Sequence, residues 1–175
     1  MKQNVILIGF MGAGKTSVGE AYARASGRKL LDTDQMIEAE AGMSISDIFS
    51  TRGEAAFRRT ETTVLEKLLE ETDQAVISVG GGLPLLEQNR TFLKRLGTVI
   101  FLRVRPETVL ERLKGDTTRP LLMGENVEQK VRGLLDYRNP FYEDAAHRII
   151  DVDGKNLKEL VEELALGESE CGGGI

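Results

Sequence analysis

The chain has 175 residues and a formal net charge of −5 at pH 7. This length suits one domain with a single sizeable hydrophobic core. The acidic balance argues against a nucleic-acid partner, because such binding usually requires a basic face. The sequence has neither a run of ~18 apolar residues nor a basic-then-apolar leader, so we expect no membrane partner.

One cysteine and one histidine limit the redox and metal chemistry. Cys171 has no second cysteine with which to form an internal disulfide, which fits a reducing cytoplasm. His147 is the only histidine, so we expect no zinc site. It lies between a predicted helix end and a predicted strand, where we expect a partner of the helix dipole or a surface residue.

The first strong motif lies between a predicted strand and a predicted helix. The short apolar run Val5–Ile8 has the character of a buried strand. It leads into Gly9-Phe10-Met11-Gly12-Ala13-Gly14-Lys15-Thr16, which matches the G-x-x-x-x-G-K-[ST] pattern of a phosphate-binding loop. An apolar helix stripe follows at Val18, Ala21, Tyr22 and Ala25.

These flanks favour a functional phosphate loop over a chance glycine-rich turn. Backbone N–H groups and the helix N-terminus would bind phosphate oxygens. Lys15 would reach the β- and γ-phosphates, and the Thr16 hydroxyl would ligate Mg²⁺. We therefore predict a nucleoside triphosphate site, in which the following residues bind ATP: Gly12, Ala13, Gly14, Lys15, Thr16 and Ser17.

Apolar runs and helical patterns alternate along the rest of the chain. Strands are predicted around residues 30–31, 75–79, 99–102 and 149–150. Helices are predicted over residues 35–41, around 48–49, over 54–71 and 85–96, from Pro106, over 127–137, and from 157 onward. This alternation predicts an α/β fold with a parallel sheet.

Two carboxylates follow the second predicted strand. The strand over residues 75–79 ends in glycines rather than in a Walker-B aspartate, so Mg²⁺ needs another carboxylate, and Asp32 and Asp34 are the nearest candidates. Residues i and i+2 of an extended segment point to the same side. The alternative is helix capping by Thr33 or Asp34, which could account for Asp34 by itself.

A second group of charges lies on the helix predicted from Glu54. Arg58 is four residues after Glu54 and three before Glu61, so the three side chains can share one face. The alternative is a solvated ion-pair ladder of little energetic value. Gly80-Gly81-Gly82 follows a buried strand and would bring bare backbone close to a small hydroxylated or anionic molecule.

Two further arginines lie late in the chain. Arg119 falls in the stretch 115–124, whose composition predicts a mobile loop, and it is either a lid arginine or a surface charge. Arg138 precedes Asn139-Pro140-Phe141-Tyr142, where we expect the helix to break. By itself, Arg138 is better interpreted as a surface residue.

Taken together, these motifs resemble those of the shikimate kinase family, from the first strand to about residue 165. They are Gly9–Thr16, Asp32-Thr33-Asp34, Gly53-Glu54-Ala55-Ala56-Phe57-Arg58, Gly80-Gly81-Gly82, Arg119-Pro120-Leu121-Leu122 and Tyr137-Arg138-Asn139-Pro140. Each motif after the phosphate loop is weak alone, but the ordered set is specific. The resemblance implies a three-layer α/β/α fold of the P-loop NTPase type, with a five-stranded parallel sheet in the order 2-3-1-4-5.

The resemblance also implies a reaction, which is phosphoryl transfer from Mg·ATP to the 3-hydroxyl of shikimate in chorismate and aromatic amino acid biosynthesis. Lys15, Asp34 and Arg119 would be catalytic, with Asp34 as a base or a positioning group. The substrate would contact Asp34, Arg58, Gly80, Gly81, Gly82 and Arg138, with Glu61 orienting Arg58. Thr16 and Asp32 would serve the metal, and the ATP site would be completed by Arg112, Arg119 and Asn156.

The expected organisation is one kinase domain over residues 1–166, with a substrate-binding segment near 34–60, a lid near 115–124 and a disordered tail over 167–175. We expect a cytoplasmic monomer whose partners are shikimate and ATP. Two other readings stay open, namely another small-molecule kinase such as a gluconate kinase, and a non-catalytic nucleotide-binding module.

Overall fold

A parallel five-stranded sheet forms the centre of the computed structural model, which describes residues 2–114 and 124–171. The strands are β1 (Asn4–Ile8), β2 (Lys29–Asp32), β3 (Ala75–Ser78), β4 (Gly97–Arg103) and β5 (Arg148–Asp151). Their order in the sheet is β2-β3-β1-β4-β5, and every neighbouring pair is parallel. The predicted sheet order is therefore confirmed.

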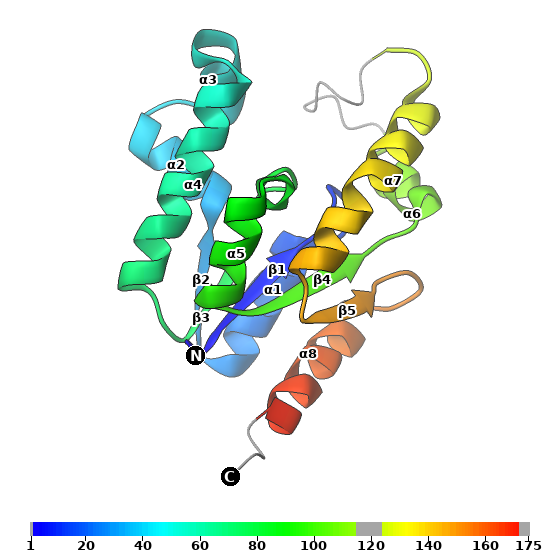
Figure 1. Cartoon of the computed structure of the whole chain (residues 1–175). Coiled ribbons are helices and arrows are strands. Elements are labelled where there is room, and N and C mark those ends of the chain that lie inside the picture. Colours follow the sequence, from blue (N-terminus) through cyan, green and yellow to red (C-terminus); the bar gives the residue numbers. More distant parts are fainter. Residues whose placement is uncertain (1, 115–123, 172–175) are drawn as a thin grey trace.

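Helices connect the strands and cover both faces of the sheet. They are α1 (Lys15–Ser26), α2 (Thr33–Ala41), α3 (Ile45–Arg52), α4 (Glu54–Glu71), the 3₁₀ turn η1 (Leu83–Leu85), α5 (Glu87–Leu96), α6 (Pro106–Arg112), α7 (Val127–Ala145) and α8 (Leu157–Cys171). Helices α1 and α8 pack together on one face, while α4, α5 and α7 cover the other (Figure 1). The fold is thus the three-layer α/β/α arrangement expected.

The core lies between the sheet and these helices. All five residues of β1 are buried, as in a parallel strand that is covered on both faces. The buried face of α1 differs from the predicted stripe, because Gly19 and Ala23 are buried whereas Ala25 is exposed. Gly19 allows this rotation, since a Cβ there would lie only 3.1 Å from the Leu30 side chain on β2.

The helix break predicted after Arg138 is wrong. Helix α7 continues through Pro140 to Ala145. Proline removes one backbone N–H donor from the helix. The following turn is nevertheless held in place because Tyr142 and Ala145 are buried in the core.

The disordered tail predicted over residues 167–175 is wrong for residues 167–171, which belong to α8. The Glu168 carboxylate accepts hydrogen bonds from the Tyr22 hydroxyl and the Arg28 guanidinium. Both partners lie about 140 positions earlier in the chain. These long-range contacts stabilise the end of the helix, and the spacing of residues within the tail does not encode them.

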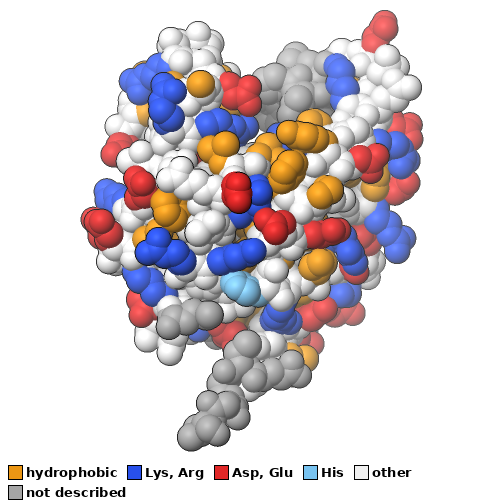
Figure 2. All heavy atoms as spheres, in the orientation of Figure 1, with side chains coloured by type: hydrophobic (Ala, Val, Ile, Leu, Met, Phe, Trp, Pro, Cys, Tyr) orange, Lys and Arg blue, Asp and Glu red, His pale blue; other side chains and the backbone are white. Residues whose placement is uncertain are grey.

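The surface carries charges of both signs, and Figure 2 shows them interspersed over one face of the molecule. Within the part of the chain that the structure describes, no helix is long and apolar enough to cross a bilayer. His147 does more than face solvent, because its Nδ1 accepts the Val99 backbone N–H of β4 at 3.0 Å. Burial lowers the pKa of this imidazole, which fits a nitrogen that acts as an acceptor.

Candidate active site

The carboxyl ends of the five strands meet at one edge of the sheet, where open α/β folds bind ligands. A cavity of about 590 Å³ lies at this edge. Its lining includes the phosphate loop, both aspartates, the triple glycine and Arg138. Motifs that are up to 130 positions apart in the sequence therefore face one space.

The phosphate loop has the backbone conformation that its glycines predict. Gly12 has φ +79° and Gly14 has φ +90°, a region that side chains with a Cβ rarely adopt. Gly14 is also the N-cap of α1, so the helix N-terminus points into the cavity. The Lys15 Nζ donates to the Gly9 carbonyl at 2.7 Å, and the Arg112 Nη1 donates to the Gly12 carbonyl at 2.8 Å.

Asp32, rather than Thr33 or Asp34, caps helix α2. One Asp32 carboxylate oxygen, Oδ1, accepts the backbone N–H groups of Asp34 at 2.9 Å and Gln35 at 3.1 Å. The helix therefore begins earlier than predicted, and Asp34 lies in its first turn rather than on an extended segment. Both aspartates still line the cavity.

The Asp34 carboxyl is well placed to hold or accept a proton. Burial raises its pKa, and the nearby Asp32 charge raises it further, while Lys15 and Arg58 oppose the shift. A raised pKa brings a carboxylate closer to the range in which it serves as a general base. This property comes from the packing of the site and could not be deduced from the residue type.

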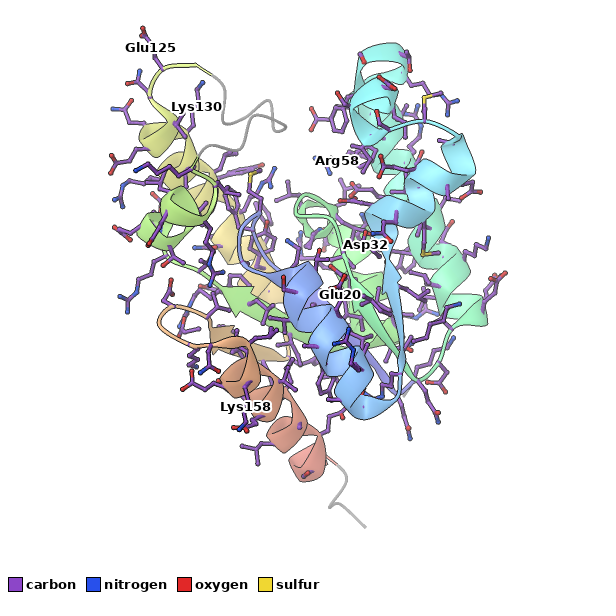
Figure 3. The ribbon with its side chains drawn as sticks, turned by 180° about the vertical axis from the view of Figure 1, so that it is seen from behind. Glu20, Asp32, Arg58, Glu125, Lys130 and Lys158 are labelled. Atoms are coloured by element: carbon purple, nitrogen blue, oxygen red, sulfur yellow. The ribbon has the colours of Figure 1, made fainter. Side chains whose placement is uncertain are left out.

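Arg58 and Glu61 form a buried ion pair on α4. The Arg58 Nη1 donates to the Glu61 Oε1 at 2.6 Å, and the Glu61 side chain is only 1% exposed. Glu54 is 3.5 Å from Arg58 on the same face, as the spacing predicted. The interpretation as a solvated ladder is therefore wrong, and Figure 3 shows Arg58 on the side of α4 toward the middle of the molecule, above Asp32.

The three glycines leave room for the charged side chains around them. A Cβ at Gly80 would lie 2.7 Å from the Asp34 Oδ1 and 3.2 Å from the Glu61 Oε2. A Cβ at Gly82 would overlap the Arg58 guanidinium. The backbone N–H of Gly80 donates to the hydroxyl of buried Thr33 at 3.1 Å, which ties this loop to the two aspartates.

Arg138 reaches the cavity from α7 and is half-buried, so its interpretation as a plain surface residue is wrong. Its guanidinium lies over the Phe10 ring of the phosphate loop, 5.7 Å from the centroid. A Cβ at Gly81 would be 3.3 Å from the Arg138 Nη1 and 3.5 Å from the Gly9 carbonyl oxygen. Gly81 thus lies where the phosphate loop and the arginine meet.

Some predicted residues are not brought into the cavity. Asn156 caps α8 instead, since its Oδ1 accepts the Glu159 N–H at 2.9 Å and its own N–H donates to the Glu159 carboxylate at 2.7 Å. Arg58 lies against Gly82 rather than among the lining residues. Arg119 and most of the predicted lid lie outside the described residues.

Sequence reasoning also missed part of the lining. Leu113, Leu157 and Leu160 face the cavity beside Lys155. The sequence predicts a helix from residue 157 onward, but an apolar residue in its first turn can face either the core or a ligand. The position of α8 beside α1 places Leu157 and Leu160 near the phosphate loop, whereas Leu113 at the end of α6 lies against Gly12.

Comparison with known proteins assigns the family. The family model described as shikimate kinase matches residues 11–166. The shikimate kinase of Symbiobacterium thermophilum is 42% identical over 163 residues, which cover 92% of this chain and 93% of that protein. The chain belongs to the shikimate kinase family. Its function is accordingly that of a shikimate kinase, an ATP-dependent enzyme that phosphorylates a small-molecule alcohol.

Solved structures agree with this membership of the shikimate kinase family. The shikimate kinase from Acinetobacter baumannii in complex with shikimate is 41% identical, with a TM-score of 0.89 over 97% of this chain and 95% of that one. The Aquifex aeolicus shikimate kinase is 34% identical, with a TM-score of 0.80 over 98% of this chain and all of that one (100%).

A gluconokinase from Sinorhizobium meliloti is also similar in structure. It is 18% identical, with a TM-score of 0.60, and the match covers 97% of this chain and 93% of the other. At that identity the likeness concerns the fold alone. The gluconate kinase and the non-catalytic nucleotide-binding module that the sequence left open are therefore both superseded by the shikimate kinase assignment.

Proposed function

We propose that this chain transfers the γ-phosphoryl group of ATP to the 3-hydroxyl of shikimate within the cavity at the carboxyl edge of the sheet. The supporting observation is that Gly81 lies between the Gly9 carbonyl of the phosphate loop and the Arg138 guanidinium. The donor and acceptor halves of the cavity are therefore in direct contact. One chain supplies both halves, so we propose that it works as a monomer in the cytoplasm, where ATP is available.

The acceptor half suits a hydroxylated carboxylate. Arg58 and Arg138 supply guanidinium groups, which bind carboxylates through paired N–H donors. Glu61 holds Arg58 at 2.6 Å and so fixes the orientation of its remaining donors. The backbone of Gly80, Gly81 and Gly82 leaves the ring of a substrate room to approach.

Asp34 is proposed to accept hydrogen bonds from the ring hydroxyls and to take the proton of the attacking one. Its burial and its raised pKa are consistent with this role. Lys15, the loop amides and Arg119 would bind phosphate oxygens and stabilise the charge that develops there. Ser17 lines the same stretch of the cavity and Arg112 holds the loop through the Gly12 carbonyl.

The donor set beside the phosphate loop fits Mg²⁺. Thr16 and Asp32 both line the cavity, and only the Oδ1 atom of Asp32 is used in capping α2. Mg²⁺ is commonly held by one or two protein oxygens together with substrate phosphates and water. Thr16 and Asp32 would hold Mg²⁺ directly or through water. The bound ion would neutralise charge on the phosphate oxygens.

The test is a coupled assay of ADP release with ATP and shikimate, run beside gluconate and a control without acceptor. We expect release that depends on shikimate and is slow in both other arms. A faster rate with gluconate would indicate another acceptor, and equal rates in all three arms would indicate a hydrolase. ATP binding without any turnover would favour a nucleotide-binding module.

A further inference from the structure

A buried tyrosine hydroxyl lies behind the acceptor half of the cavity and belongs to none of the motifs above. Tyr142 of α7 is fully buried, and its ring packs against Phe101 of β4 with centroids 5.1 Å apart. Its hydroxyl donates to the Gly81 carbonyl at 2.6 Å. The ring is therefore held by the core while the hydroxyl contacts the triple glycine.

Arg138 approaches the same hydroxyl from one helical turn earlier. Residues four apart lie on one face of a helix. A Cβ at Gly81 would lie 3.3 Å from the Arg138 Nη1 and 3.6 Å from the Tyr142 oxygen. Both groups therefore lie beside Gly81. Burial raises the pKa of Tyr142, and the nearby positive charge of Arg138 lowers it.

The donors and acceptors of Tyr142, Gly81 and Arg138 can be matched in one way. A tyrosine hydroxyl has one proton to donate and lone pairs that accept. The proton is used on the Gly81 carbonyl, and guanidinium N–H groups can only donate, so the lone pairs of the Tyr142 oxygen are the part of this hydroxyl that can accept from Arg138. The Nε of Arg138 is buried and has no hydrogen-bond partner among the described residues. No hydrogen bond through Nε therefore fixes the guanidinium within that part of the chain.

We propose that Tyr142 is a positioning residue, whose hydroxyl fixes Arg138 against the triple glycine so that its guanidinium meets the substrate carboxylate. This inference rests on the proposed function, in which Arg138 binds that carboxylate. Tyr142 itself does not line the cavity, so its effect on the substrate would pass through Arg138 and Gly81.

The test is Tyr142→Phe, which removes the hydroxyl and keeps the ring in the core. We expect the KM for shikimate to rise about tenfold, the size of one hydrogen bond to a charged group, with little change in kcat or in the KM for ATP. Tyr22→Phe is the matched control, because Tyr22 is equally buried and its hydroxyl binds Glu168 at the α1–α8 contact. It should leave the KM for shikimate unchanged.

A double-mutant cycle separates positioning from a general loss of stability. In an Arg138→Ala background, Tyr142→Phe should have no further effect on the KM for shikimate, because the residue through which it acts is gone. All variants are assayed at a temperature at which thermal melts show them folded. Additive effects in the cycle, or equal losses for both substrates, would overturn the inference.

The wild-type assay keeps this inference distinct from the proposed function. Failure of the wild-type chain to phosphorylate shikimate would count against the function itself. An active wild type with an unchanged KM for shikimate in Tyr142→Phe would count against the role of Tyr142 alone.

Discussion

At the residue scale, the phosphate-loop motif specifies that a lysine is present, and the structure shows where its side chain lies. Lys15 donates to the Gly9 carbonyl and lines the cavity beside Thr16 and Asp34. Its charge therefore lies at the phosphate loop. The sequence predicted this residue because the pattern of the loop specifies both the lysine and its place at the start of a helix.

Lys15→Ala should lower kcat by at least about a hundredfold, since one donor to developing charge contributes that much in other enzymes. Lys67→Ala is the control, because Lys67 is exposed on α4 and should leave kcat unchanged. The measurement is steady-state ADP release with shikimate. A normal kcat in Lys15→Ala would contradict the placement of the phosphoryl group.

Glu61 is a residue whose environment, rather than its type, sets its behaviour. Burial raises its pKa from 4.5 to about 7, the charge of Asp34 adds to the shift, and Arg58 and Arg138 oppose it. The folded chain therefore holds a proton on Glu61 at pH values where the unfolded chain has released it. By linkage, the stabilisation from this group is complete below pH 4.5 and is lost as pH rises through about 7.

Glu61→Gln should remove this part of the pH dependence. One pKa unit corresponds to about 1.4 kcal/mol, so the lost contribution is at most on the order of 3–4 kcal/mol. Denaturant unfolding of both proteins between pH 4.5 and 7.5 measures it, and the residual slope includes Asp34, whose pKa is also raised. Identical slopes in the two proteins would contradict the raised pKa of Glu61.

At the element scale, helix α5 links three elements, namely helix α4, the turn η1 and helix α7. Buried Asn89 accepts the Thr62 hydroxyl of α4 at 2.8 Å and donates to the Leu83 carbonyl of η1 at 2.9 Å. Arg90 donates to the carbonyls of Pro84 at 2.9 Å and Leu85 at 3.0 Å and pairs with Asp144 of α7 at 2.6 Å. The turn after the triple glycine is therefore linked to the helices of Arg58 and Arg138.

Arg90→Ala should loosen this turn and raise the KM for shikimate by about three- to tenfold, with a loss of about 1–2 kcal/mol in the free energy of unfolding. Arg95→Ala on the same helix is the control, because Arg95 is exposed. Steady-state kinetics and urea unfolding measure the two effects. If both variants behave alike, α5 contributes only its apolar packing.

At the scale of the whole molecule, the last helix lines the cavity that the phosphate loop also lines. The first turn of α8 contributes Leu157 and Leu160 to the lining, while its far end is held on α1 by Glu168. Helix α1 also begins with Lys15 of the phosphate loop. The position of α8 thus depends on a contact near the end of the chain.

Glu168→Ala should therefore lower the free energy of unfolding by about 1–2 kcal/mol, because the Tyr22 hydroxyl and Arg28 lose their common partner. Glu162→Ala is the control, since Glu162 is exposed on the same helix. Thermal and urea unfolding give the comparison, and the KM for shikimate should not change. Equal free energies of unfolding for the two variants would mean that apolar packing alone holds α8 in place.

The sequence alone determined the α/β class, the phosphate loop and the ion pairing of Arg58 with Glu61. These features depend on local periodicity or fixed spacing. Regular backbone geometry places residues with such spacing on the same face of a helix or strand. The ordered set of motifs was specific enough to indicate the family, which the comparisons then confirmed.

Contacts between distant parts of the chain set which residues face the cavity and which support it. Asn156 caps α8 through a local contact with Glu159, whereas the resemblance implied a contact with ATP. Pro140 lies within α7 and residues 167–171 extend α8, both contrary to the local pattern. The Tyr142 hydroxyl likewise contacts Gly81, 61 positions away in the chain. Burial and long-range hydrogen bonds outweighed local preference at these places, and neither can be deduced from neighbouring residues.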